Sequence, residues 1–72
     1  MAKDVPLAAM DKIIRDTGAL RISESAKEEL RALVIAHCET IAERAVRLAR
    51  HAGRRTVQEA DIELALEQSR NL

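Results

Sequence analysis

The sequence contains no aromatic residue and only two Gly, one Pro and one Cys in 72 residues. The lone Cys38 excludes an intramolecular disulfide and leaves no CxxC pair for a zinc site. No uncharged apolar run reaches the roughly 18 residues that span a bilayer, and the amino end lacks the basic-then-apolar pattern of a secretory signal. We therefore expect one small cytoplasmic domain, covering residues 1–72, without membrane contact and held together by packing alone.

Apolar residues make up 34 of the 72 positions, and they recur at helical rather than alternating spacing. Gly18 and Gly53 divide the chain into three such segments. The pattern predicts helices at about residues 4–17, 23–51 and 57–69, separated by tight loops. The expected fold class is therefore all-α.

Polar residues at the predicted helix starts suggest how each helix is capped. Asp4 is a candidate cap for the first helix, and Ser23 for the second. Ser25 with Glu28 also matches a capping box, so the second start has two candidate positions. The run Thr56–Glu59 predicts a further capping box at the start of the third helix.

The predicted middle helix is too long for its own chain to bury. At about 1.5 Å per residue it spans roughly 42 Å, which exceeds the width of a globule of this size. Its widened apolar face must therefore also pack against a second copy of the chain, and we expect an obligate homodimer. The residues expected in the dimer core are Leu30, Leu33, Val34, His37, Ile41 and Ala45.

Twelve basic and twelve acidic residues give a formal net charge of zero, which argues against strong nucleic-acid binding. The charge is unevenly distributed, however, because one stretch without acids holds Arg44, Arg47, Arg50, Arg54 and Arg55. The first three are interpreted as a solvated helix face. Arg54 and Arg55 differ, because they precede a helix amino terminus, where free backbone N–H groups and the Thr56 hydroxyl favour an anion.

A weaker version of this pattern occurs earlier in the chain. Arg21 lies just before the second predicted helix, and Lys12 and Arg15 lie three residues apart on the first. These three cations are the remaining candidates for contact with an anion.

Several stretches of the chain together resemble one known family. The run Leu48–Val57 and the run Asp61–Ala65, with Ile13–Asp16 and Arg21–Ser23 nearer the start, are similar to archaeal histones, the tail-less form of the histone fold. The resemblance covers essentially the whole chain. It implies a handshake homodimer in which two long helices cross antiparallel, so that the first loop of one chain lies beside the second loop of the other.

The resemblance also implies a function: sequence-independent binding, bending and compaction of double-stranded DNA as a nucleoid chromatin protein. It implies an ion pair between Arg54 and Asp61 that fixes the second loop. Leu48, His51 and Asp61 match positions through which family dimers associate into tetramers and longer stacks. The DNA-binding residues carried over from the family, or expected from the loop charge, are Lys12, Arg15, Arg21, Arg54, Arg55 and Thr56.

The alternative function is a histone-fold interaction module of a transcription or assembly complex, with weak DNA affinity of its own. Another histone-fold chain is a further candidate partner. His51 and Asp61 could be considered a catalytic dyad, but no activated nucleophile accompanies them. His37 and Cys38, near the middle of the long helix, are expected to fill space, with metal binding or a redox crosslink as the minority interpretation. We expect no catalytic residue, cofactor or metal.

Overall fold

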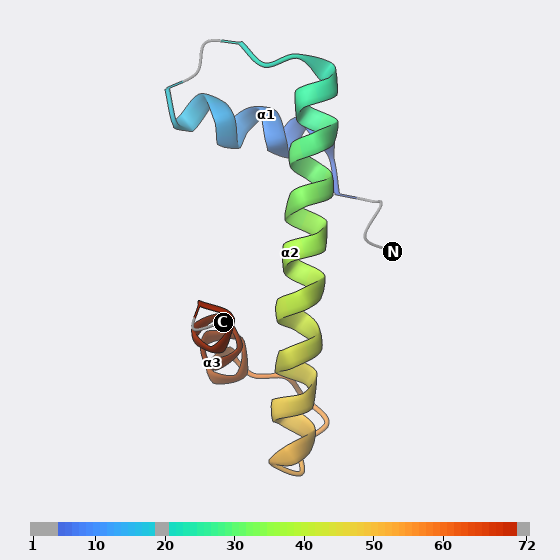
Figure 1. The fold of residues 1–72 in the computed structure, drawn as a ribbon, viewed down its shortest axis with the longest axis vertical. Helices are drawn as coiled ribbons and strands as arrows, with labels where there is room; N and C mark the ends of the chain where they lie inside the picture. Colours follow the sequence, from blue (N-terminus) through green and yellow to red (C-terminus); the bar gives the residue numbers. More distant parts are fainter. Residues whose placement is uncertain (1–4, 19–20, 71–72) are drawn as a thin grey trace. The chain divides into compact units, whose positions relative to one another are not determined.

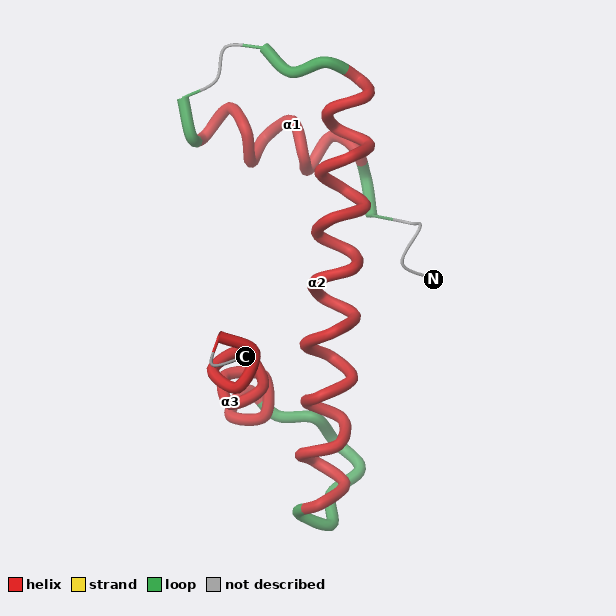
Figure 2. The backbone as a smooth tube through the Cα atoms, viewed as in Figure 1, coloured by secondary structure: helices red, strands yellow, loops and turns green. Residues whose placement is uncertain are grey.

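The computed structural model describes residues 5–18 and 21–70. They form three helices, α1 (Leu7–Asp16), α2 (Glu24–His51) and α3 (Glu59–Arg70). Figure 2 shows helices joined by loops, and no strand in these two ranges. The predicted all-α class is confirmed. Within the same ranges no helix is long and apolar enough to cross a membrane.

The first helix is shorter than the sequence suggested. It begins at Leu7, after Pro6 in an extended conformation that makes no side-chain cap bond. The candidate cap Asp4 lies outside the described residues. Gly18 ends the helix as expected, because its N–H donates to the Arg15 carbonyl at 3.0 Å while its φ of +104° suits a glycine.

Ser23, and not Ser25, caps the start of α2. Its Oγ accepts a hydrogen bond from the Ala26 N–H at 3.1 Å, and its carbonyl accepts one from the Lys27 N–H at 3.0 Å. The Ser25 hydroxyl lies 3.3 Å from the Ser23 hydroxyl, already inside the helix. Of the two starts that the sequence allowed, the structure has the earlier one.

The carboxyl end of α2 is closed by two turn hydrogen bonds. The Gly53 N–H donates to the Arg50 carbonyl at 2.9 Å, and the Arg54 N–H donates to the Ala49 carbonyl at 2.9 Å. This pair of bonds is a Schellman motif, in which the residue after the cap needs a positive φ. Gly53 supplies it at +76°. The chain therefore leaves α2 in a fixed direction at Arg54.

The capping box predicted at Thr56–Glu59 is wrong, because α3 begins at Glu59 and Thr56 lies before it. The Gln58 N–H instead donates to Asp61 Oδ2 at 2.8 Å. A carboxylate three residues into the helix thus satisfies the N–H of the capping residue, which is one half of a capping box, two residues later than expected. Asp61 can do this because other contacts hold its carboxylate at the helix start.

The chain divides into two compact units, residues 1–36 and 37–72. In the first unit α1 lies against the amino-terminal part of α2 (Figure 1). Lys27 Nζ lies 3.8 Å from Asp11 Oδ1, and Arg31 Nη1 donates to the Val5 carbonyl at 3.4 Å. Met10 on α1 is buried in this unit.

In the second unit α3 packs on the carboxy-terminal part of α2 (Figure 1). The contact is built from Ile41, Ala45 and Ala65, which are buried, with Leu48 and Leu66 partly buried around them. Alanines provide much of this contact, so the apolar area that it removes from water is small.

Large apolar side chains remain exposed on the single chain. They are Ile13, Leu33, Val57, Ile62 and Leu64. Of the predicted dimer-core residues, Ile41 and Ala45 are buried within the chain, Leu30 and Val34 are half-buried, and Leu33 and His37 are exposed. A chain with so small a core and so much exposed apolar surface has surface available for a partner.

Candidate nucleic-acid interface

The loop between α2 and α3 is fixed by one arginine. Arg54 Nη1 lies 2.8 Å from Asp61 Oδ2, and Nη2 lies 2.8 Å from Oδ1, so the guanidinium holds the carboxylate with both ends. Arg54 Nη1 also donates to the Thr56 carbonyl at 3.0 Å. The two residues expected as a loop ion pair are therefore in contact, and they tie the loop to the first turn of α3.

Asp61 is deeply placed for a carboxylate, with 5% of its surface exposed. The Arg54 hydrogen bonds and the Gln58 N–H together lower its pKa to about 2. The same contact raises the pKa of the Arg54 guanidinium above its usual value. Both groups stay charged near neutral pH and largely cancel each other, so Arg54 acts mainly by positioning the loop.

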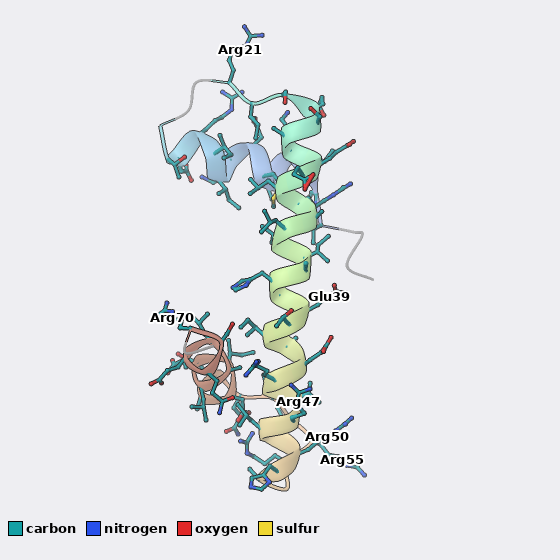
Figure 3. The ribbon with its side chains drawn as sticks, viewed as in Figure 1. Arg21, Glu39, Arg47, Arg50, Arg55 and Arg70 are labelled. Atoms are coloured by element: carbon teal, nitrogen blue, oxygen red, sulfur yellow. The ribbon has the colours of Figure 1, made fainter. Side chains whose placement is uncertain are left out.

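Arg55 and Thr56 follow in the same loop and are exposed. Figure 3 shows Arg55 projecting from the loop and away from the helices, with Arg50 projecting from α2 nearby. Within the described ranges no carboxylate pairs with either arginine. Arg50, Arg54 and Arg55 line one shallow depression that contains no acidic residue. The second loop therefore presents free positive charge beside the start of a helix, which favours an anion.

Arg21 occupies the corresponding position in the first loop, two residues before the Ser23 cap. Its side chain is exposed and projects away from α1 and the start of α2 in Figure 3. It has no ion-pair partner in the part of the chain that the structure describes. Both loops thus carry an arginine just before a helix that no described carboxylate neutralises.

Lys12 and Arg15 on α1 differ from the loop arginines, because each has an acidic neighbour one turn away. Lys12 Nζ lies 3.1 Å from Asp16 Oδ2, and Arg15 Nε lies 2.8 Å from Asp11 Oδ2. Exposed pairs of this kind contribute about 0.2–1 kcal/mol, so a phosphate can displace the carboxylates at low cost. These cations are available to an anion, but only in competition with their own acids.

Leu48 and His51 lie together, whereas Asp61 does not join them. Leu48 is half-buried and His51 is exposed, and both line a depression with Arg44, Arg47 and Gln68. The sequence alone suggested only a solvated face for the two arginines. The helical spacing could have predicted that these arginines lie beside Leu48 and His51, because Arg44 and Leu48, and likewise Arg47 and His51, are four residues apart on α2.

His37 and Cys38 also lie at the surface. They line an apolar groove with Ile41, Ala42, Ile62 and Leu66. Across residues 5–18 and 21–70 no group of three or more His, Cys, Asp or Glu side chains is placed to hold a metal ion.

Comparison with known proteins gives the family. Residues 3–66 match the family model of histone-like transcription factor (CBF/NF-Y) and archaeal histone. The chain is also 38% identical over 63 residues to one of the subunits of archaeal histone HAN1 from Thermococcus zilligii, covering 88% of this chain and 94% of that protein. The three helices and their two glycine-closed ends agree with the histone fold expected from the sequence. The chain therefore belongs to the family of histone-like transcription factors (CBF/NF-Y) and archaeal histones.

Proposed function

We propose that this chain binds double-stranded DNA without reading its sequence, and that as a homodimer it bends and compacts DNA as a chromosome-associated nucleoid protein. The observation that carries the proposal is the pair of exposed loop arginines, Arg21 and Arg55, each just before a helix start and without an ion-pair partner among residues 5–18 and 21–70. Histone-fold proteins of this family are structural, and the chain is not an enzyme.

The exposed apolar surface supports the dimer. Leu33 leaves 61% of its surface exposed, and the groove beside His37 is lined mainly by apolar side chains. In a handshake dimer the long helices cross near their midpoints, so a second chain would cover this surface. The crossing would also bring Arg21 of one protomer beside Arg55 and Thr56 of its partner, so that each end of the dimer carries two free cations.

Phosphate contacts explain how such a surface would hold DNA. Loop arginines, the Thr56 hydroxyl and helix amino termini bind phosphate oxygens and leave base edges unread. The Arg54–Asp61 pair keeps the second loop in position for this contact. Lys12 and Arg15 would hold the middle of the bound DNA after exchanging their carboxylates for phosphates.

The zero net charge sets the strength of binding. Cations attract DNA by releasing its counterions, and the acids of the same chain oppose this over the distance of a Debye length. We therefore expect weak and strongly salt-dependent binding. DNA flexibility, rather than base sequence, should decide where the dimer prefers to bind.

Growth beyond the dimer is the last part of the proposal. The surface of Leu48 and His51 is where dimers would associate further on DNA. Asp61 was predicted to share this contact, but its carboxylate is already held by Arg54 and Gln58 within the chain. Leu48 and His51 would therefore carry the contact, together with the arginines beside them.

A gel-shift titration across a salt series tests the DNA proposal. The duplex has random sequence and is shorter than the DNA persistence length of about 150 base pairs. The wild-type protein should shift it at low salt, and the affinity should fall as salt rises. An Arg21→Ala, Arg55→Ala double variant should lose most of this binding, and its salt slope should drop by roughly 0.9 for each phosphate that it no longer neutralises.

Arg70→Ala provides the control, because Arg70 is an exposed arginine at the carboxyl end of α3, away from the loop between α2 and α3 (Figure 3). It should bind DNA almost as well as the wild type. If the wild-type dimer does not bind at any salt concentration, the DNA proposal fails. The alternative, an interaction module of a transcription or assembly complex, would then take its place.

A further inference from the structure

Asp11 on α1 lies between two cations that belong to different helices. Its Oδ2 accepts a hydrogen bond from Arg15 Nε of α1 at 2.8 Å, and its Oδ1 lies 3.8 Å from Lys27 Nζ of α2. The second distance is an ion-pair distance but is too long for a hydrogen bond. Oδ1 is buried and accepts no hydrogen bond from residues 5–18 and 21–70. One oxygen of the carboxylate is therefore occupied, while the other has unused acceptor capacity beside α2.

Lys27 is able to use that capacity. Its side chain is 19% exposed, and its ammonium group donates to Glu24 Oε1 at 3.0 Å. An ammonium group has three N–H donors, so two are left for other acceptors. The hydrogen bond to Glu24 and the charges of Glu24 and Asp11 raise the pKa of Lys27, which keeps it charged. A shift of about 1 Å would bring Asp11 Oδ1 within hydrogen-bonding distance of this ammonium group.

The other cation pair on α1 is built differently. Asp16, which holds Lys12, exposes 65% of its side chain, whereas Asp11 exposes only 26%. Among the described residues Asp16 has no second cation within ion-pair distance. When its pair with Lys12 opens, water can solvate the Asp16 carboxylate. Asp11 is less accessible to water, so it needs another partner when Arg15 is withdrawn.

We propose that Asp11 exchanges Arg15 for Lys27 when DNA binds, so that Arg15 becomes free to hold a phosphate. The inference rests on the proposed function, in which Arg15 holds the middle of the bound DNA. Lys27 is then a positioning residue. It strengthens DNA binding without contacting DNA, because it neutralises a carboxylate that would otherwise repel the phosphates or hold Arg15 back.

A double-mutant cycle on the same random-sequence duplex tests the exchange. Lys27→Gln should weaken binding by roughly 2- to 30-fold more than Arg70→Gln does, because the bound dimer loses two charge pairs. Its salt slope should equal that of Arg70→Gln, since no phosphate contact is lost. Asp11→Asn should tighten binding, because Arg15 is then free in any case. In this background Lys27→Gln should cause no loss beyond that of Arg70→Gln.

Asp16→Asn is the matched control, because it removes the same charge from the same helix but leaves Asp11 in place. In this background Lys27→Gln should still weaken binding as it does in the wild type. Lys27→Arg keeps the positive charge beside Asp11 and should bind like the wild type. Circular dichroism checks that each variant is folded, and Lys27→Met replaces Lys27→Gln if the latter loses helix.

The remaining outcomes are distinguishable. A loss that persists in the Asp11→Asn background, with a salt slope lower by roughly 0.9 for each phosphate contact, would make Lys27 itself a phosphate ligand. A persistent loss with an unchanged slope would indicate that Lys27 acts through Glu24. Either result would overturn the exchange, as would a Lys27→Gln protein that binds like Arg70→Gln. If the wild type does not bind DNA at any salt concentration, the proposed function fails, and the exchange fails with it.

Discussion

Arg54 and Arg55 are neighbours in the chain, but they differ in the carboxylate that each can reach. The turn after Gly53 directs Arg54 toward Asp61, while Arg55 projects into solvent. The sequence identifies both as cations before a helix. The charge pattern alone does not show which of them Asp61 will neutralise, because that depends on the direction of the turn; the pairing with Arg54 was predicted only through the resemblance to archaeal histones.

The same holds for the other cations of the candidate site. Arg21 was predicted correctly as a loop arginine. The sequence did not predict that Asp16 pairs with Lys12 and Asp11 with Arg15, as they do in the structure. Rotamers decide such pairs, and several partners lie within reach of a long side chain. The residue types at these positions could thus be predicted, but not which of the cations are free to bind an anion.

The lowered pKa of Asp61 predicts how acid affects stability. A carboxyl with a lowered folded-state pKa stabilises the fold fully above its unfolded value of about 3.9. This contribution is lost as the pH falls toward the folded pKa of about 2. Asp61→Asn should therefore lower the free energy of unfolding at neutral pH, and the difference from wild type should shrink between about pH 4 and pH 2. Urea unfolding of both proteins at a fixed chain concentration, repeated at each pH, measures this difference in the free energy of unfolding.

Asp16→Asn is the control for this measurement. Asp16 also pairs with a cation, but 65% of its side chain is exposed, and a pair in solvent contributes little. It should change stability only slightly over the same pH range. An Asp61→Asn difference that stays constant down to pH 2 would contradict the role given to the Arg54 contact.

At the scale of the helices, the sequence predicts how many helices form and in which order better than it predicts where each one begins and ends. Both glycines end helices as expected, because few other residues tolerate the positive φ that these ends require. The start of α3 was misplaced by two residues, since a cap depends on which side chain reaches the free N–H. Thr56 had the appropriate residue type for a cap, but Asp61, held by Arg54, accepts the hydrogen bond from the Gln58 N–H instead.

The start of α2 yields a prediction that discriminates between its two serines. Ser23→Ala removes the hydroxyl that accepts from the Ala26 N–H, and should destabilise the protein by about 1 kcal/mol for each chain. Ser25→Ala, inside the helix, should cost much less, because alanine favours helix interiors. Thermal unfolding at equal chain concentration compares them. Equal losses would indicate that the cap hydrogen bond contributes little.

At the scale of the whole molecule, the deciding feature is apolar surface that one chain cannot bury. The sequence predicted this from the length of the middle helix alone, and the structure has that helix at 28 residues. The net charge of zero, in contrast, gives no information on where the basic and acidic side chains lie on the folded surface. A depression at the second loop is lined by arginines without an acidic residue, whereas another on α2 is lined by both arginines and glutamates, and only the folded unit shows this arrangement.

Leu33 provides the most direct test of the dimer, because its role differs between one chain and two. In the single chain, 61% of its surface is exposed, so a charged residue there should be tolerated by a monomer. In the proposed dimer it lies in the core, where an unpaired charge is costly. Leu33→Glu should therefore dissociate and unfold the protein, measured by sedimentation and circular dichroism. Ala32→Glu, the adjacent exposed position roughly 100° around the helix, should remain a folded dimer. A folded, dimeric Leu33→Glu protein would show that α2 meets its partner through a different face.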